Sequence, residues 1–255
     1  MPTDRIQGSL YTSIQNKVAT VEFGHPASNS FVSTLLQRLT DELNSLSKNE
    51  NVSVILLKSE GERAFCAGAS FDELVAISNL EEGKAFFSGF ANVINAMRNC
   101  KQPIIGRVQG KTVGGGVGLA AACDYVYATE AASIKLSEIT IGIAPLVIAP
   151  AVERKVGKAA LAELSWSPAE WKSAYWAKEK GLFSKVHENI SDMDKSLEIH
   201  VEKLASYNPK ALREMKRVLW EGTSHWDDLL MERAAASGRL ALSPETKAAL
   251  DKFKK

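Results

Sequence analysis

One acid, Glu138, lies in an apolar stretch of the sequence and is the first candidate for chemistry. No other aspartate or glutamate occurs between Glu130 and Glu153, and the neighbours Leu136 and Ile139 are apolar. A carboxyl group in such surroundings has a raised pKa, which suits general acid–base catalysis. The competing interpretation is an ordinary solvated glutamate at the end of a strand or helix.

Two glycine-containing turns precede predicted helices. Gly114-Gly115-Gly116 follows a predicted strand, and Gly68-Ala69 precedes Ser70 and Glu73, whose spacing is typical of a helix capping box. Glycine allows sharp turns and close approach of a ligand, and free N–H groups at helix starts can face a developing negative charge. Two such donors aimed at one point would form an oxyanion hole, as enolate chemistry on a thioester requires. Two ordinary tight turns are the competing interpretation.

Other polar and aromatic residues favour structural roles. Cys66 has no histidine near it in the sequence, so we expect a packed thiol and not a nucleophile. Asp124, at the end of an apolar segment, is expected to be a structural hydrogen-bonding group. An aromatic set could line an acyl pocket, or equally could be a packed helix face or a subunit contact: Trp166, Trp171, Tyr175 and Trp176.

Composition excludes several classes of function. The 255 residues carry a formal net charge of +1, which gives no argument for nucleic acid or an anionic membrane as partner. No apolar run approaches the roughly 20 residues of a membrane span. The four histidines lack metal-ligand spacing, and three scattered cysteines indicate reduced thiols. We therefore expect a cytoplasmic protein without a metal.

Periodicity predicts an α/β fold that becomes helical after residue 145. The opening order of strand, helix and strand is typical of a crossover unit with parallel pairing. We expect a core over residues 1–195 and a helical region over 196–255. The predicted strands are 17–23, 52–57 and 103–108, with a short strand or turn at 181–186. The predicted helices are 33–49, 86–99, 117–123, 158–164, 168–180, 193–205 and 209–220, followed by two short helices.

Three sequence blocks together carry a resemblance. They are Ala-Phe-Cys-Ala-Gly-Ala at 64–69, Val-Gly-Gly-Gly at 113–116 with Cys-Asp at 123–124, and Leu-Ser-Glu-Ile at 136–139 with Gly142 and Pro145 beyond it. In their order and separation the chain resembles the enoyl-CoA hydratase/isomerase (crotonase) superfamily along nearly its whole length. The resemblance implies a spiral of ββα units with a C-terminal helical trimerisation region. It also implies homotrimers or dimers of trimers, and an acyl-CoA substrate with no further cofactor.

The resemblance also implies a set of site residues. The peptide N–H groups of Ala69 and Gly115 would hold the thioester carbonyl, and Glu138 would be the catalytic acid or base. The implied contacts to the acyl-CoA are Ala27, Ser28, Ala67, Gly68, Ser70, Gly114, Gly118 and Phe253.

One position departs from the pattern that the resemblance implies. Hydratases with two catalytic carboxylates carry the first in the helix after the glycines, where this chain has Gly118. We expect Gly118 to leave room for water or for a bulkier substrate. A second acid could instead come from Asp72, Glu73 or Glu153.

Three functions follow from this departure. Hydration of an α,β-unsaturated acyl-CoA is favoured. The combination of Gly-Gly-Gly-Val-Gly-Leu at 114–119, Leu-Ser-Glu at 136–138 and the apolar segment 146–150 is most similar to methylglutaconyl-CoA hydratases, so the substrate would be that thioester or another branched short-chain one. Isomerisation of a double bond through Glu138 alone is the first alternative. A homologue that binds acyl-CoA without turnover is the second.

Overall fold

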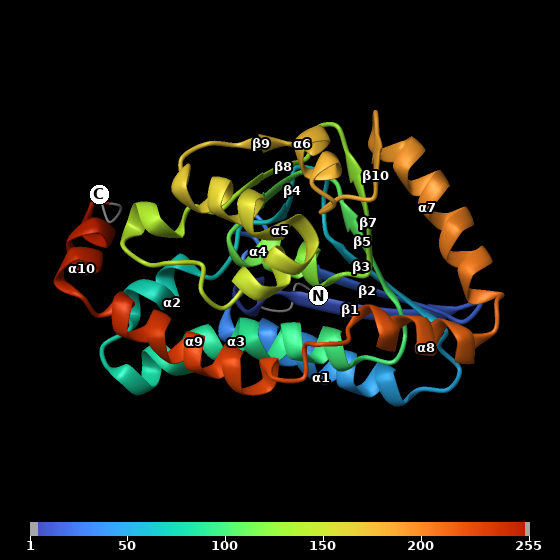
Figure 1. Cartoon of the computed structure of the whole chain (residues 1–255), viewed down its shortest axis with the longest axis horizontal. Coiled ribbons are helices and arrows are strands. Elements are labelled where there is room, and N and C mark those ends of the chain that lie inside the picture. Colours follow the sequence, from blue (N-terminus) through green and yellow to red (C-terminus); the bar gives the residue numbers. More distant parts are fainter. Residues whose placement is uncertain (1–4, 253–255) are drawn as a thin grey trace.

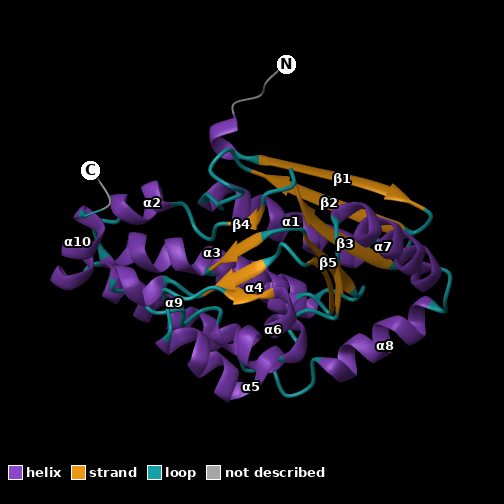
Figure 2. Ribbon diagram, turned by 90° about the horizontal axis from the view of Figure 1, so that it is seen from above, coloured by secondary structure: helices purple, strands orange, loops and turns teal. Residues whose placement is uncertain are grey.

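Two β-sheets form the centre of the structure, a computed structural model that describes residues 5–252 (Figures 1 and 2). The larger sheet contains, in spatial order, β1 (Ser9–Gln15), β2 (Val18–Gly24), β3 (Val54–Ser59), β5 (Ile104–Val108), β7 (Tyr125–Thr129) and β10 (Lys185–His187). The smaller sheet contains β4 (Ala64–Cys66), β6 (Lys111–Val113), β8 (Ser133–Lys135) and β9 (Lys172–Ser173). Only the β1–β2 and β8–β9 pairs are antiparallel among the paired strands.

The two sheets grow together along the chain. Each of β3, β5 and β7 adds to the larger sheet, and the strand that follows it, β4, β6 or β8, adds to the smaller one. A helix then follows before the next strand of the larger sheet. The expected α/β spiral of ββα units is therefore confirmed, as is the helical C-terminal region.

Helices surround the two sheets. Their bounds are η1 (Arg5–Gln7), α1 (Ser33–Lys48), α2 (Phe71–Ala76), α3 (Leu80–Asn99), α4 (Gly115–Ala122), η2 (Glu138–Ile141), α5 (Ala149–Trp166), α6 (Ala174–Glu179), α7 (Ile190–Ala205), α8 (Pro209–Leu219), α9 (Trp226–Ala241) and α10 (Pro244–Asp251). None of the helices in the described part of the chain has the length and apolarity to cross a membrane.

Several sequence predictions need correction. The prediction missed β1, an exposed edge strand joined to β2 by Asn16 and Lys17, both with positive φ as a tight hairpin turn requires. Helix α3 begins at Leu80, six residues before the predicted start. The Asn79 side chain caps the helix there by accepting a hydrogen bond from the Glu82 N–H. The helix predicted over residues 168–180 is instead β9 followed by α6, since Lys172 and Ser173 pair with β8.

The C-terminal helices pack on the core of the same chain. Helix α7 covers the larger sheet, and α9 lies along α3 (Figure 1). At the α3–α9 crossing a Cβ atom on Gly83 would lie 2.9 Å from the Gly238 Cα. Only glycines allow the two backbones to approach so closely. Helix α10 then reaches η2, where the Thr246 hydroxyl donates to the Gly142 carbonyl at 2.7 Å.

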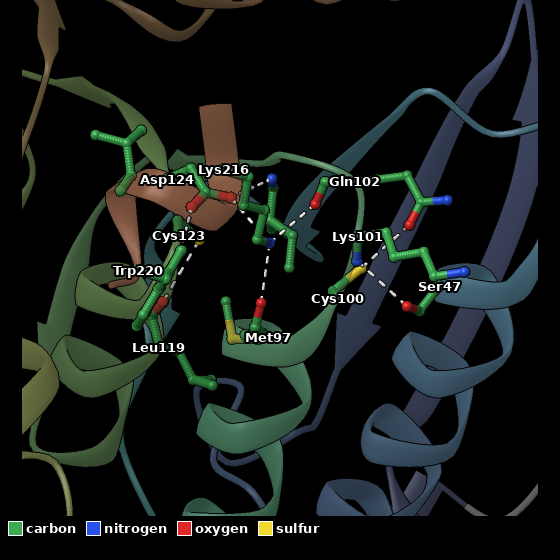
Figure 3. A network of polar contacts seen from close by, with 12 residues as sticks. Ser47, Met97, Cys100, Lys101, Gln102, Leu119, Cys123, Asp124, Lys216 and Trp220 are labelled. Carbon is green, nitrogen blue, oxygen red and sulfur yellow. Dashed lines mark hydrogen bonds and ion pairs between the residues drawn. The ribbon is translucent and has the colours of Figure 1, made fainter. Parts of the chain in front are cut away.

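A buried carboxylate, Asp124, connects the end of α4 to the C-terminal helices (Figure 3). It accepts hydrogen bonds from the Ile104 N–H and from the Trp220 indole N–H, each at 2.7 Å. The Lys216 ammonium lies 3.1 Å from the same group. The expected structural role of Asp124 is therefore confirmed.

Lys216 is as fully bonded as its partner. Its side chain is 3% exposed, and its ammonium also donates to the carbonyls of Met97 and Gln102, each at 2.9 Å. A buried ion pair is stable only when each charge is hydrogen-bonded in this way, because desolvation of both ions is costly. Helix α8 is thus attached at one point to α3, to α4 and to the start of β5.

We predict that Lys216→Met lowers the free energy of unfolding by about 3–5 kcal/mol, because it leaves Asp124 as a buried charge without its counterion. Urea unfolding followed by circular dichroism measures the change. Lys210→Met, at an exposed position of the same helix, is the matched control. A loss no larger than that of the control would contradict the role given to the buried pair.

Candidate functional site

A cavity of about 390 Å³ opens where three parallel strands of the smaller sheet end. Six of the predicted site residues line it: Ala67, Gly68, Ala69, Gly114, Gly115 and Glu138. Ala69, Gly115 and Glu138 follow the last residues of β4, β6 and β8 by two or three positions. Because these strands are parallel neighbours, their carboxyl ends meet at one edge, which is where ligands bind in such sheets. The spiral thus brings residues that are far apart in sequence to one place.

The N–H group of Ala69 lies between two bonded neighbours. Phe31 donates to the Gly68 carbonyl at 2.8 Å and accepts from the Ser70 N–H at 2.7 Å. The Ala69 N–H between them has no acceptor among residues 5–252. Gly68 has a φ of +91°, and a Cβ there would lie 3.6 Å from the Gly115 nitrogen. The positive φ favours glycine at 68, and the 3.6 Å separation shows that the two glycine turns are neighbours.

The second free N–H group belongs to Gly115 at the start of α4. Gly114 precedes the helix with a φ of +52°, and its N–H donates to the Lys135 carbonyl at 2.9 Å. Gly115 occupies the first helical position, where an N–H has no intrahelical partner, and none exists in the described part of the chain. A Cβ on Gly115 would lie 2.3 Å from the Phe90 ring, so only glycine fits. Two unpaired donors thus face the same cavity.

The Glu138 carboxyl lies beside the glycine turn. It is the first residue of η2, and a Cβ on Gly114 would lie 2.7 Å from its Oε1 atom. The residue keeps some accessible surface, but its Oε2 is buried and has no hydrogen-bond partner among the described residues. Desolvation raises the pKa of this carboxyl to about 7. The expectation of a raised pKa is confirmed.

Gly118 does not provide the space that we expected. A Cβ there would lie 2.4 Å from the Ile148 Cγ2 and 2.7 Å from its Cβ, and Gly118 does not line the cavity. Ile148 does line it, with Leu146 and Val147 beside it. The prediction of room for water or a bulkier substrate at Gly118 is therefore wrong, because an apolar side chain fills that space.

No second acid reaches the cavity among the described residues. Asp72 is exposed to solvent. Glu73 accepts hydrogen bonds from the N–H and hydroxyl of Ser33 instead. Glu153 lies 3.8 Å from the Lys158 ammonium on α5. The sources of a second carboxylate that the sequence suggested are thus all engaged or exposed elsewhere.

Three of the remaining predicted contacts, Ser70, Ala27 and Ser28, do not line the cavity. The Ser70 hydroxyl caps α2 by accepting from the Glu73 N–H at 3.3 Å. Ser28 and Ala27 form a turn that is joined to the cavity edge, where the Ala67 N–H donates to the Ser28 carbonyl at 3.1 Å. Phe253 lies outside the described residues.

The thiol of Cys66 is packed, as expected. It is fully buried beneath the glycine turn, where a Cβ on Gly116 would lie 2.7 Å from the Cys66 Cβ. Burial raises the pKa of this thiol to about 12, so it is protonated at neutral pH.

The prediction also missed residues that line the cavity from distant elements. Phe90 comes from α3, Ile148 immediately precedes α5, and Ser237 comes from α9. Their residue types match those of ordinary helix faces, so the sequence carried no signal for them. Only the packing of the helices reveals their role.

The buried carboxyl predicts a pH dependence of stability. Below pH 4.5 Glu138 is protonated in both states, so it adds no penalty. Between about pH 4.5 and 7 the unfolded state loses the proton while the folded state keeps it, and the penalty is complete above pH 7. We therefore expect Glu138→Gln to gain about 3 kcal/mol over wild type between pH 4 and pH 8.

Urea unfolding of both proteins across this pH range measures the difference. Glu198→Gln, at an exposed position of α7, is the matched control. A difference between wild type and Glu138→Gln that stays constant with pH would show that the carboxyl is solvated.

Comparison with known proteins gives a consistent family. The family model described as "Enoyl-CoA hydratase/isomerase" matches residues 13–248. A peroxisomal Delta(3,5)-Delta(2,4)-dienoyl-CoA isomerase of Arabidopsis thaliana is 31% identical over 189 residues, which cover 69% of this chain and 67% of that protein. A mitochondrial methylglutaconyl-CoA hydratase of Rattus norvegicus is 33% identical over 199 residues, which cover 76% of this chain but only 62% of the rat protein. The crystal structure of an enoyl-CoA hydratase from Bacillus halodurans matches the fold with a TM-score of 0.87, at 17% identity, over 95% of this chain and 99% of that one.

Proposed function

Since this chain belongs to the enoyl-CoA hydratase/isomerase family, we propose that it moves the double bond of an acyl-CoA thioester, with Glu138 as the sole acid–base residue. The observation that carries the proposal is the filled position at Gly118. Where a water-activating carboxylate would be needed, the cavity wall is the apolar side chain of Ile148. One carboxyl suffices to move a proton between two carbons.

The proposed reaction uses the three elements of the cavity edge. The thioester carbonyl oxygen accepts hydrogen bonds from the Ala69 and Gly115 N–H groups. Glu138 takes the proton from the α-carbon of a 3-enoyl-CoA, and the electron pair moves onto the carbonyl oxygen as an enolate, which the two donors stabilise. The protonated Glu138 then returns the proton to the γ-carbon, which leaves a 2-enoyl-CoA of the same mass. A pKa of about 7 suits both steps, because the group loses and regains a proton near neutrality.

The outer part of the thioester is assigned to the turns beside β4. Ala67 and Gly68 line the cavity next to the donors and would contact the pantetheine arm. Ser70 keeps the turn in place as a cap, while Ala27 and Ser28 lie by the nucleotide part. Gly114 would border the acyl group. A larger residue at this position would collide with Glu138.

Hydration is the second candidate, and the name of one relative supports it, although another relative is named as an isomerase. The rat methylglutaconyl-CoA hydratase shares 33% identity with this chain. In that case Glu138 alone would exchange protons with both water and carbon, and the substrate would be that thioester or another branched short-chain one. The apolar wall around Ile148 argues against an ordered water at the place where a second acid would hold it.

The proposal includes a location in a reducing compartment, the cytoplasm. The three cysteines are buried and unpaired in the described part of the chain. Free thiols are typical of proteins that are not exposed to oxidising conditions.

A turnover assay that identifies the product tests the proposed function. We expect wild type to convert a 3-enoyl-CoA without change of mass, and Glu138→Gln to lower kcat by about 10²–10⁴-fold, as loss of a general acid–base group does. The absorbance of the conjugated thioester and the mass of the product are measured, and Glu198→Gln is the matched control. Gain of one water on crotonyl- or methylglutaconyl-CoA, lost in Glu138→Gln, would instead establish a hydratase. Tight binding without turnover, equal in both proteins, would favour the non-catalytic alternative.

Self-association into trimers, or into dimers of trimers, is also part of the proposal. Helix α8 exposes apolar side chains along one face: Met215, Val218 and Leu219 are between 45% and 52% exposed. Val218 and Leu219 are three and four residues after Met215 and therefore lie on the same side of the helix as Met215. A contiguous exposed apolar face is typical of a protein–protein contact.

We expect light scattering to give the mass of three or six chains for wild type. The double substitution Met215→Lys/Leu219→Lys should lower the mass toward that of one chain, because it buries charge in the contact. Lys210→Met serves as the control on the same helix. A wild-type mass of one chain at micromolar concentration would contradict the proposed assembly.

A further inference from the structure

The hydroxyl of Ser237 is a polar group of the cavity that the proposed reaction does not use. The residue lies on α9, is 1% exposed and lines the cavity. Its Oγ has no hydrogen-bond partner among the described residues. A hydroxyl within a helix ordinarily bonds to the carbonyl one turn earlier. Ser88 and Thr40 do so in this chain, with distances of 2.7 Å to the Lys84 carbonyl and 2.9 Å to the Leu36 carbonyl.

The position of Ser237 is fixed by a close backbone contact between α9 and α3. The next residue, Gly238, meets Gly83 of α3 backbone to backbone, and a Cβ on Gly238 would lie 2.7 Å from the Gly83 carbonyl carbon. Helix α9 therefore cannot shift away from α3 without losing this contact. The Ser237 hydroxyl is held at the cavity by the backbone itself.

The distance from the thioester site can be followed along α3. Phe90 lies against Gly115, where the carbonyl would bind, whereas Gly83 lies against Gly238 beside Ser237. Seven residues of helix separate Phe90 from Gly83, or roughly 10 Å at 1.5 Å per residue. Ser237 is thus at the far end of the cavity from the oxyanion donors. A group that reaches it must be several carbons away from the thioester.

The surroundings of Ser237 favour an uncharged partner. The cavity is lined largely by apolar side chains, among them a cluster that packs together: Leu74, Phe86, Phe87, Ile141 and Ile143. The cationic residue that lines the cavity, Lys135, has its ammonium 4.6 Å from the centre of the Trp171 ring. Arg233, one turn before Ser237, donates to the Leu146 carbonyl instead. A carboxylate would therefore be buried without a counterion, which is costly.

We infer that Ser237 selects acyl-CoA substrates that carry an uncharged oxygen, a hydroxyl or keto group, near the far end of a medium-length acyl chain. The Oγ of Ser237 hydrogen-bonds to that oxygen. The inference rests on the proposed function, since it names the substrate class of the same site. An unmatched buried hydroxyl is unfavourable, and a substrate oxygen relieves that cost, whereas a plain hydrocarbon chain does not.

Binding measurements test the inference without turnover. Isothermal calorimetry compares two saturated thioesters of equal length, one plain and one with a hydroxyl near the chain end. We expect wild type to bind the hydroxylated ligand about tenfold more tightly or better, and Ser237→Ala to lose that preference. Ser88→Ala, which removes an exposed hydroxyl from α3, is the matched control and should keep the preference. The melting temperature of Ser237→Ala should be unchanged or higher, because an unpaired buried group is removed.

The outcomes separate this inference from the proposed reaction. Equal binding of both ligands by wild type, or a preference that survives in Ser237→Ala, would overturn the inference whatever the enzyme catalyses. Loss of the preference in Ser237→Ala supports it even if no double bond is moved. When 3-enoyl substrates are turned over, kcat/KM for the plain and hydroxylated pair should show the same difference.

Discussion

The buried carboxylate of Asp124 is the interaction on which the arrangement of the site depends. It stands directly after α4, whose opposite end presents the Gly115 N–H to the cavity. The same carboxylate fixes the first N–H of β5 and, through Lys216 and Trp220, the helix that leads to α9. Because the charges are almost fully buried, they are stable only while all these partners are present. The helix that presents the Gly115 N–H and the segment that leads to α9 are thereby both anchored at Asp124 (Figure 3).

The spiral explains how three chemically different groups reach one small volume. Each turn of the spiral adds one short strand to the smaller sheet. A turn with a free N–H follows β4, a helix start with a free N–H follows β6, and a short helix that begins with an acid follows β8. The parallel order of β4, β6 and β8 places these three segments side by side. None of the three segments is attached through a long loop. The distances between their chemical groups are therefore set by the sheet, which is more rigid than a loop.

The sequence predicted the parts of this site that depend on local chemistry. Local sequence was enough to identify glycine turns before helices, a capping serine and an isolated acid in an apolar segment. Gly68, Gly115 and Glu138 were predicted for this reason. Features that depend on contacts between distant elements carried no such signal. Ile148 fills the space beside Gly118 because α5 crosses α4, and Ser237 reaches the cavity because two glycines meet at the α3–α9 crossing.

The secondary structure follows the same division. The long helices α1, α7 and α8 were predicted nearly to their ends, because their apolar periodicity is strong. The edge strand β1 was missed, since five of its seven residues are exposed and its apolar positions are few. The segment at 168–180 was predicted as one helix, whereas pairing with β8 holds its middle in a strand. Tertiary contacts outweighed local preference at both places.

Desolvation of Glu138 and exclusion of water have the same structural cause. The side chains of Leu146, Val147 and Ile148 line the same cavity as the acid, and burial is the main reason that the pKa of Glu138 rises to about 7. A second carboxylate in this wall would repel the first and require its own solvation. The apolar wall therefore makes one carboxyl competent to give and take a proton near neutral pH. Among the described residues that line the cavity, no second carboxylate shares this task with Glu138.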